Sequence, residues 1–79
     1  MSENTSERLS LPAERPLRFL RMRDLVQMTH LSKSTLYAMH AQGKFPKVVR
    51  LSERTSVWVE SEVLAWMEER VAHGRSVPN

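Results

Sequence analysis

Four hydrogen-bond donors, Lys33, Ser34, Thr35 and Tyr37, lie within one short stretch of the chain. A lysine can reach guanine acceptors or a phosphate, and serine or threonine hydroxyls can donate to a phosphate or a base edge. A tyrosine hydroxyl can donate to a phosphate in the same way. In a helix, Lys33, Ser34 and Tyr37 share the outer face at spacings i, i+1 and i+4. We therefore predict that these four residues contact nucleic acid.

The segment around these donors has the layout of a helix, a tight turn and a second helix. Residues 23–29 carry apolar side chains at helical spacing, and His30 occupies the turn, where a left-handed backbone is often needed. Ser32 is placed to cap a second helix over residues 33–42 by accepting the N–H of Ser34 or Thr35. Gly43 and a nearby proline end that helix. This layout predicts a helix-turn-helix whose second helix docks in a major groove.

A β-hairpin is expected after the second helix. Residues 48–51 and 56–59 are β-branched and apolar, and a four-residue polar turn separates them. The hairpin would form a wing with Lys47 and Arg50 on its first arm and Arg54 at its tip. We predict that Lys47 and Arg50 clamp the nucleic-acid backbone, and that Arg54 enters a minor groove or binds a phosphate.

Basic residues are concentrated in the middle of the chain. The formal net charge of the 79 residues is +3. Residues 19–59 hold seven lysines and arginines against two acidic residues, a net of +5, whereas residues 1–18 are neutral and residues 60–79 carry −2. Arg21 and Arg23 open the first helix, and we predict that they too reach phosphates. This distribution favours a phosphate-binding face on the helix-turn-helix and the wing.

The last helix is expected to begin near Glu60 or Ser61 and to end at Gly74. We divide the chain into a disordered arm over residues 1–16, one domain over residues 17–73 and a flexible tail over residues 74–79. The residues assigned to the core are Thr29, Leu36, Phe45, Trp58, Val63 and Trp66. Val57 and Leu64 are expected to be exposed apolar contacts.

The composition disfavours several classes of protein. The chain has no cysteine and its three histidines lack metal-ligand spacing, so we predict no metal, no cofactor and no disulfide. No nucleophile–base pair or glycine-rich phosphate loop is present, and we predict that the protein is not an enzyme. No apolar run approaches the roughly 20 residues that span a bilayer, and no signal peptide is evident. We therefore expect a cytoplasmic protein.

Residues 19–70 carry a combination of motifs that resembles one family. The strings are RMRDL at 21–25, THLSKSTLY at 29–37, GKFPK at 43–47 and WVESEV at 58–63, followed by Ala65 and Trp66. Together they resemble the AlpA-type regulators of phages and integrated elements, which are small excisionase-like proteins related to the MerR-type winged helix. The resemblance implies a mostly helical winged helix-turn-helix with three helices and a two-stranded wing. It also implies a DNA-binding transcriptional regulator, a recombination directionality factor, or both.

Several alternatives remain open from the sequence. The expected partner is double-stranded DNA at an attachment site or promoter, with an integrase or RNA polymerase as a further partner and self-association on DNA. Activator, repressor and excision factor are not distinguished. A second class is a winged-helix protein-interaction module, whose partner surface would include Tyr37, Val57 and Leu64. An enzyme or antitoxin-like module is the remaining alternative.

Overall fold

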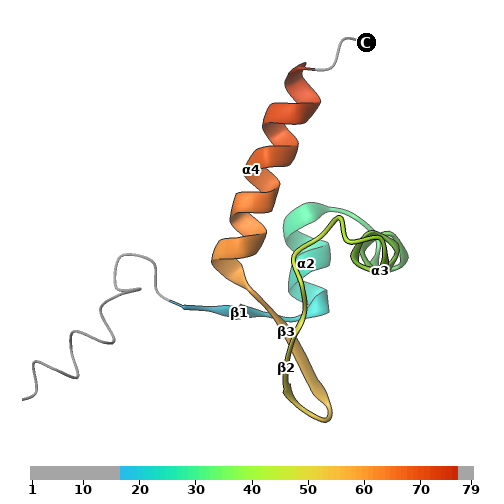
Figure 1. Ribbon diagram of the computed structural model, residues 1–79, viewed down its shortest axis with the longest axis vertical. Helices are drawn as coiled ribbons and strands as arrows, with labels where there is room; N and C mark the ends of the chain where they lie inside the picture. The colour runs from blue at the N-terminus through green and yellow to red at the C-terminus, as the bar shows by residue number, and fades with distance from the viewer. Residues whose placement is uncertain (1–16, 77–79) are drawn as a thin grey trace, which may run out of the picture.

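The computed structural model describes residues 17–76. The predicted arm, residues 1–16, and the last three tail residues lie outside this range. Within it, the chain forms three helices and a small antiparallel sheet, and the β2–β3 hairpin projects away from the helices (Figure 1). The elements, in chain order, are β1 (Phe19–Leu20), α2 (Met22–Thr29), α3 (Lys33–Ala41), β2 (Val49–Ser52), β3 (Thr55–Val59) and α4 (Glu60–Ser76). This is a winged helix-turn-helix, and the predicted fold class is confirmed.

The α2–α3 connection is a tight turn held by a left-handed residue. His30 has φ 63° and ψ 17°, and its N–H donates to the carbonyl of Val26 at 2.9 Å. The Thr29 hydroxyl donates to the carbonyl of Leu25 and accepts the N–H of Leu31, at 2.8 and 3.1 Å. The predicted left-handed turn at His30 is therefore confirmed, and the side chain of Thr29 fixes the direction in which the chain leaves α2.

Both ends of α3 are closed by local hydrogen bonds. Ser32 has extended backbone angles, and its hydroxyl accepts the N–H of Thr35 at 3.1 Å, as the sequence predicted. At the other end, Gly43 adopts φ 75° and donates to His40, while Lys44 donates to Met39. This pair of bonds is a Schellman motif, which requires the left-handed conformation that glycine adopts without strain.

Replacing Ser32 with alanine should lower the free energy of unfolding by about 1 kcal/mol, because the first turn of α3 loses its capping acceptor. The measurement is chemical denaturation followed by circular dichroism. Ser34→Ala is the matched control, since its hydroxyl contacts Ser32 but accepts no backbone N–H in the described hydrogen bonds. Equal losses of stability in the two variants would contradict the capping role.

The wing is a hairpin that gains a third strand. β2 pairs with β3 with Val49 opposite Val57 and Arg50 opposite Ser56, and an irregularity follows Arg50. Two predictions need correction. The strands extend further than expected, so that the turn contains only Glu53 and Arg54 instead of four residues. In addition, β1 pairs with β3 on its other edge, so the predicted two-stranded wing belongs to a three-stranded sheet ordered β1-β3-β2.

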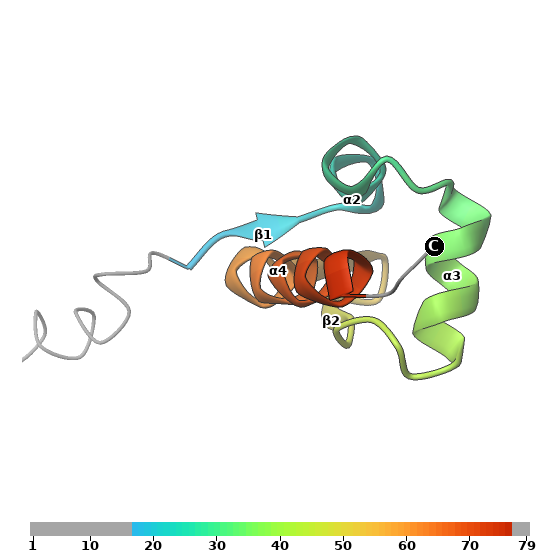
Figure 2. The same ribbon diagram turned by 90° about the horizontal axis from the view of Figure 1, so that it is seen from above.

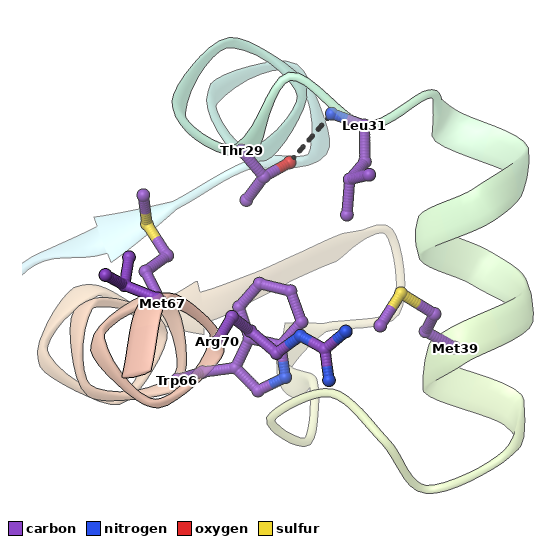
Figure 3. A pocket seen from close by; sticks show the side chains of 7 residues that line it. Thr29, Leu31, Met39, Trp66, Met67 and Arg70 are labelled. Atoms are coloured by element: carbon purple, nitrogen blue, oxygen red, sulfur yellow. Dashed lines mark hydrogen bonds between the residues drawn. The ribbon is translucent and has the colours of Figure 1, made fainter. Parts of the chain in front are cut away.

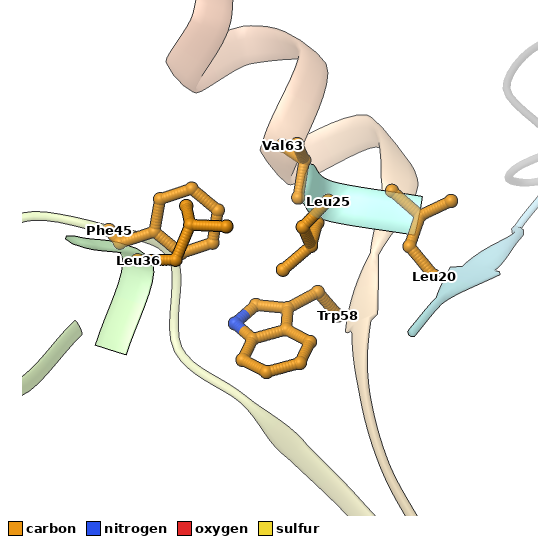
Figure 4. Packing of buried hydrophobic residues seen from close by; sticks show 6 residues of the cluster. All are labelled: Leu20, Leu25, Leu36, Phe45, Trp58 and Val63. Carbon is orange, nitrogen blue, oxygen red and sulfur yellow. The ribbon is translucent and has the colours of Figure 1, made fainter. Parts of the chain in front are cut away.

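The core lies where α2, α3, α4 and the sheet meet (Figure 4). Trp58, which is only 4% exposed, packs among side chains from every one of these elements. Burial of this kind is the main favourable contribution to the stability of so small a domain. The buried members of the cluster are Leu20, Leu25, Leu36, Phe45, Trp58 and Val63.

Three predicted burial assignments are wrong or incomplete. Val57, expected at the surface, is 3% exposed because it points to the side of β3 opposite Trp58 and is covered there. Thr29 and Trp66, expected in the core, are half-buried. Trp66 packs against the core from its edge, and Leu64 is exposed as predicted.

Helix α4 continues past its predicted end. It runs without interruption through Gly74 to Ser76, so residues 74–76 are helical rather than part of a flexible tail. Gly74 does not need a left-handed conformation here, and its sequence position alone does not stop the helix. Figure 1 shows the C-terminal half of α4 extending away from the sheet. None of the helices in residues 17–76 is long and apolar enough to cross a membrane.

Candidate nucleic-acid interface

Four of the nine predicted contact residues meet in one open cleft between α2, α3 and the wing. Arg21 and Arg23 come from the start of α2, Tyr37 from α3, and Arg54 from the β2–β3 turn. The cleft has a volume of ≈ 290 Å³. The remaining lining residues are Met22, Ser56 and Trp58. Residues far apart in the sequence therefore converge on one hollow.

Local structure places each of these side chains. Arg21 is the N-cap residue of α2, and its N–H donates to the Asp24 carboxylate at 2.8 Å. Arg23 is exposed in the first turn of that helix. Tyr37 is 54% exposed on α3, about 100° around the helix from the buried Leu36. Three guanidinium groups and a phenol at one hollow suit an anion such as a phosphate, because each supplies N–H or O–H donors.

The turn of the wing fixes the last arginine of the cleft. The N–H of Arg54 donates to the Ser52 hydroxyl at 3.3 Å, which orders the two-residue turn. Ser56 follows on β3 and adds a hydroxyl to the cleft. Ser56 was not among the predicted contact residues, because its position opposite Arg50 follows from the strand pairing, which only the structure shows.

The other donors of α3 lie along its exposed first turn. Lys33, Ser34 and Thr35 are all exposed and do not line the cleft. Ser32 contacts the hydroxyls of Ser34 and Thr35 at 3.2 and 2.9 Å. The cap therefore orients these two side chains at the start of the helix, where backbone N–H groups also point outward.

The two basic residues of the first wing arm are separate from the cleft. Lys47 lines another hollow, which it shares with His40 and Phe45. Arg50 is exposed on β2, opposite Ser56. The structure thus gathers Arg21, Arg23, Tyr37 and Arg54 in the cleft. The other five predicted residues are exposed but lie outside it: Lys33, Ser34, Thr35, Lys47 and Arg50.

The segment that joins α3 to the wing is held by two tryptophans. The indole N–H of Trp66 donates to the carbonyl of Lys44 at 2.8 Å, and that of Trp58 donates to the carbonyl of Pro46 at 3.0 Å. Phe45 lies between these carbonyls and packs edge to face on both indoles, with ring centroids 4.8 Å from Trp66 and 6.4 Å from Trp58. Both tryptophans therefore combine apolar packing with a specific polar anchor.

A histidine supplies the third anchor of the same segment. Nε2 of His40, near the end of α3, accepts the N–H of Val48 at 3.3 Å, and the imidazole contacts the Trp58 ring edge-on. The chain is thus tied at every second residue between α3 and β2. Because these ties are side-chain contacts, they fix the position of the wing relative to α3.

Comparison with known proteins connects this arrangement to one family. Residues 18–71 match the family described as prophage CP4-57 regulatory protein (AlpA). The chain belongs to the AlpA family. It is also 39% identical over 64 residues to the uncharacterized protein ORF88 of Enterobacteria phage P4, covering 81% of this chain and 73% of the phage protein. No solved structure matches the chain.

The AlpA match covers the whole candidate interface. All nine predicted contact residues lie between positions 21 and 54, within the matched range 18–71. Across residues 17–76, histidine and acidic side chains do not form a group of three that could hold a metal ion. Within residues 17–76, the candidate binding groups of this AlpA-family chain are therefore the arginines of the cleft and the exposed donors at the start of α3.

Proposed function

We propose that this protein is a sequence-specific DNA-binding regulator. The observation that carries the proposal is the cleft in which Arg21, Arg23 and Arg54 converge with Tyr37 beside the exposed face of α3. A duplex backbone passing between α3 and the wing would place a phosphate in this cleft. Membership of a family of prophage regulatory proteins supports the same conclusion.

The proposed division of labour follows from position. The cleft residues bind phosphates and so set the orientation of the protein on the duplex. Phosphate contacts of this kind do not distinguish one base sequence from another. Lys33, Ser34 and Thr35, at the exposed start of α3, are placed to read base edges in the major groove. Lys47 and Arg50 extend the basic surface along the wing.

We further propose that the protein acts as a transcriptional regulator, an excision factor or both. It would act in the cytoplasm and would not be an enzyme. Regulation of transcription would involve RNA polymerase, whereas an excision factor bends DNA beside an integrase. A footprint of the protein on the attachment site and on the promoters of its genetic element distinguishes these roles. Protection at neither kind of site would contradict the proposal.

Substitution of Lys33 by alanine should reduce discrimination between the specific site and a site with one changed base pair by about 1–3 kcal/mol. The measurement is titration of both duplexes at two salt concentrations. Lys44→Ala is the matched control, because it removes the same charge from a position just beyond the C-terminal end of α3. If both variants lose affinity equally on all duplexes, Lys33 contributes only to phosphate binding.

The protein-interaction alternative is weakened by the burial of one proposed contact. Tyr37 and Leu64 are exposed, but Val57 is not, and it is unavailable to a partner without unfolding of the wing. Tyr37 also shares its hollow with three arginines, which favours an anionic ligand over an apolar one. Duplex binding that does not weaken as salt rises would favour this alternative.

A further inference from the structure

An apolar stripe remains partly exposed along α4, on the flank of the helix beside the face that carries the buried Val63. Leu64 is 43% exposed and Val71 is 52% exposed, with the half-buried Met67 between them. Their spacing of i, i+3 and i+7 places the three side chains in one row along the helix. Figure 1 shows that the C-terminal half of α4 projects beyond the sheet, and Figure 2 shows the same helix from the side of its C-terminal end.

The row borders an apolar groove between α4 and the α2–α3 turn. The groove has a volume of ≈ 320 Å³, and Met67 and Val71 form part of its wall (Figure 3). Trp66 lies deeper in the groove, with the guanidinium of Arg70 5.9 Å above its ring. The other lining residues are Thr29, Leu31 and Met39.

Charge at the two ends of the row indicates what can cover it. Glu60 stands four residues before Leu64, and Arg75 stands four residues after Val71, so the row is acidic at one end and basic at the other. An identical helix laid antiparallel places Arg75 against Glu60 at both ends, and Leu64 against Val71 in between. A parallel arrangement would place Glu60 against Glu60 and Arg75 against Arg75, which is unfavourable. In the antiparallel arrangement the exposed Glu68, which borders the middle of the row, is the one charge that meets its own copy.

We propose that this row is the contact between two copies of the protein, paired antiparallel through α4. The pairing is isologous, because the same residues contribute from both copies about a twofold axis near Met67. The N-terminal end already holds one ion pair, Arg18 with Glu60 at 3.6 Å. Glu60 keeps part of its carboxylate accessible, with 23% side-chain exposure, and Arg75 is exposed.

The pairing is weak in free solution and becomes effective on DNA. Three partly exposed apolar side chains bury far less than the roughly 800 Å² per partner of a stable complex. Two copies on one duplex meet at an effective concentration of about 1 mM, which compensates for a weak contact. The pairing on DNA rests on the proposed function, whereas the contact between the two helices does not.

Cysteine cross-linking tests the contact directly, because the natural chain has no cysteine. Chains carrying Leu64→Cys are mixed with chains carrying Val71→Cys and oxidised. One experiment uses about 1 mM protein without DNA, and a second uses micromolar protein with a long duplex. The antiparallel pairing should give the mixed 64–71 dimer in at least about tenfold excess over either homodimer. Equal positions lie seven residues apart along the paired helices, about 10 Å, beyond the Cα separation of about 7 Å that a disulfide tolerates.

The matched control moves the cysteine by one residue. Ala65 is exposed and adjoins Leu64 in sequence, but it lies about 100° further around the helix. Chains with Ala65→Cys should link to the Val71→Cys chains only at the background rate. A dominant 64–64 dimer, equal linking by Ala65→Cys, or no mixed dimer at about 1 mM would each overturn the proposal. Loss of duplex binding with the mixed dimer retained would instead count against the proposed function alone.

Charge reversal provides a second test of the antiparallel direction. Arg75→Glu in the cysteine chains should lower the yield of the mixed dimer several-fold, and adding Glu60→Lys should restore it. His73→Glu is the control, because His73 occupies the same last turn but a different face of α4. An equal loss with His73→Glu would show that the effect comes from the helix terminus, and would overturn the assigned ion pair.

Discussion

The Trp58→Ala variant is expected to be unfolded at ordinary temperature. Trp58 is 4% exposed, and its indole N–H donates to the carbonyl of Pro46 at 3.0 Å. Truncation of a buried tryptophan costs about 3–5 kcal/mol, and the part-buried carbonyl of Pro46, left without its donor, adds to this. A domain of this size has a free energy of unfolding near the low end of about 5–15 kcal/mol, so little stability remains. Circular dichroism and a thermal scan provide the measurement.

Two further variants separate packing from the polar anchor. Trp58→Phe keeps most of the ring but removes the donor to Pro46, and it should fold with reduced stability. Trp66→Ala should be milder than Trp58→Ala, because Trp66 is half-buried at the edge of the core. If Trp58→Ala unfolds cooperatively at the same midpoint temperature as the wild type, packing around Trp58 does not contribute to the stability of the fold.

Removal of two cleft arginines should nearly abolish DNA binding at physiological salt. In the Arg23→Ala/Arg54→Ala double variant, α2 and the wing each lose one guanidinium from the cleft. A hydrogen bond to a charged group contributes about 1.5–3 kcal/mol, so affinity for any duplex should fall by about a hundredfold or more. The slope of log K against log salt should become shallower by about two units, one for each lost phosphate contact.

The single variants and a distant arginine make this test specific. Arg54→Ala alone should reduce the slope by about one unit and weaken binding to all sequences by a similar factor. A larger loss on A·T-rich duplexes would place Arg54 in a narrow minor groove instead. Arg70→Ala removes the same charge from α4, away from the cleft, and should leave the slope unchanged. If Arg70→Ala and Arg54→Ala behave alike, the cleft has no particular role and only net charge matters.

Local sequence signals predicted the helix-turn-helix well because its determinants are local. Ser32, His30 and Gly43 each act on backbone groups within a few residues of themselves, and all three adopt the expected roles. The wing was harder to delimit. Polar residues at 52 and 55 can belong to a strand or a turn, and only pairing across the hairpin assigned them to strands. Gly74 failed as a stop signal for a similar reason, since glycine permits a left-handed cap but does not impose one.

Long-range contacts decided what the sequence could not. Alternation along β3 shows that Val57 and Trp58 face opposite sides, but it does not show that both sides are covered. The short strand β1 forms only because β3 offers it an edge, and two residues carry too little pattern to predict it. The sequence also gave no sign that Trp66 would lie at the edge of the core rather than inside it.

The sequence by itself determined which residues are available as donors to a phosphate or a base, and which helix presents them. These are properties of residue type, capping and helical period, which act over a few positions. Only the tertiary structure decided that Arg21, Arg23, Tyr37 and Arg54 share one cleft while Lys47 does not. That outcome depends on the angle between α3 and the wing. The anchors of Lys44, Pro46 and Val48 set this angle, and their partners lie 8 to 22 residues away in the chain.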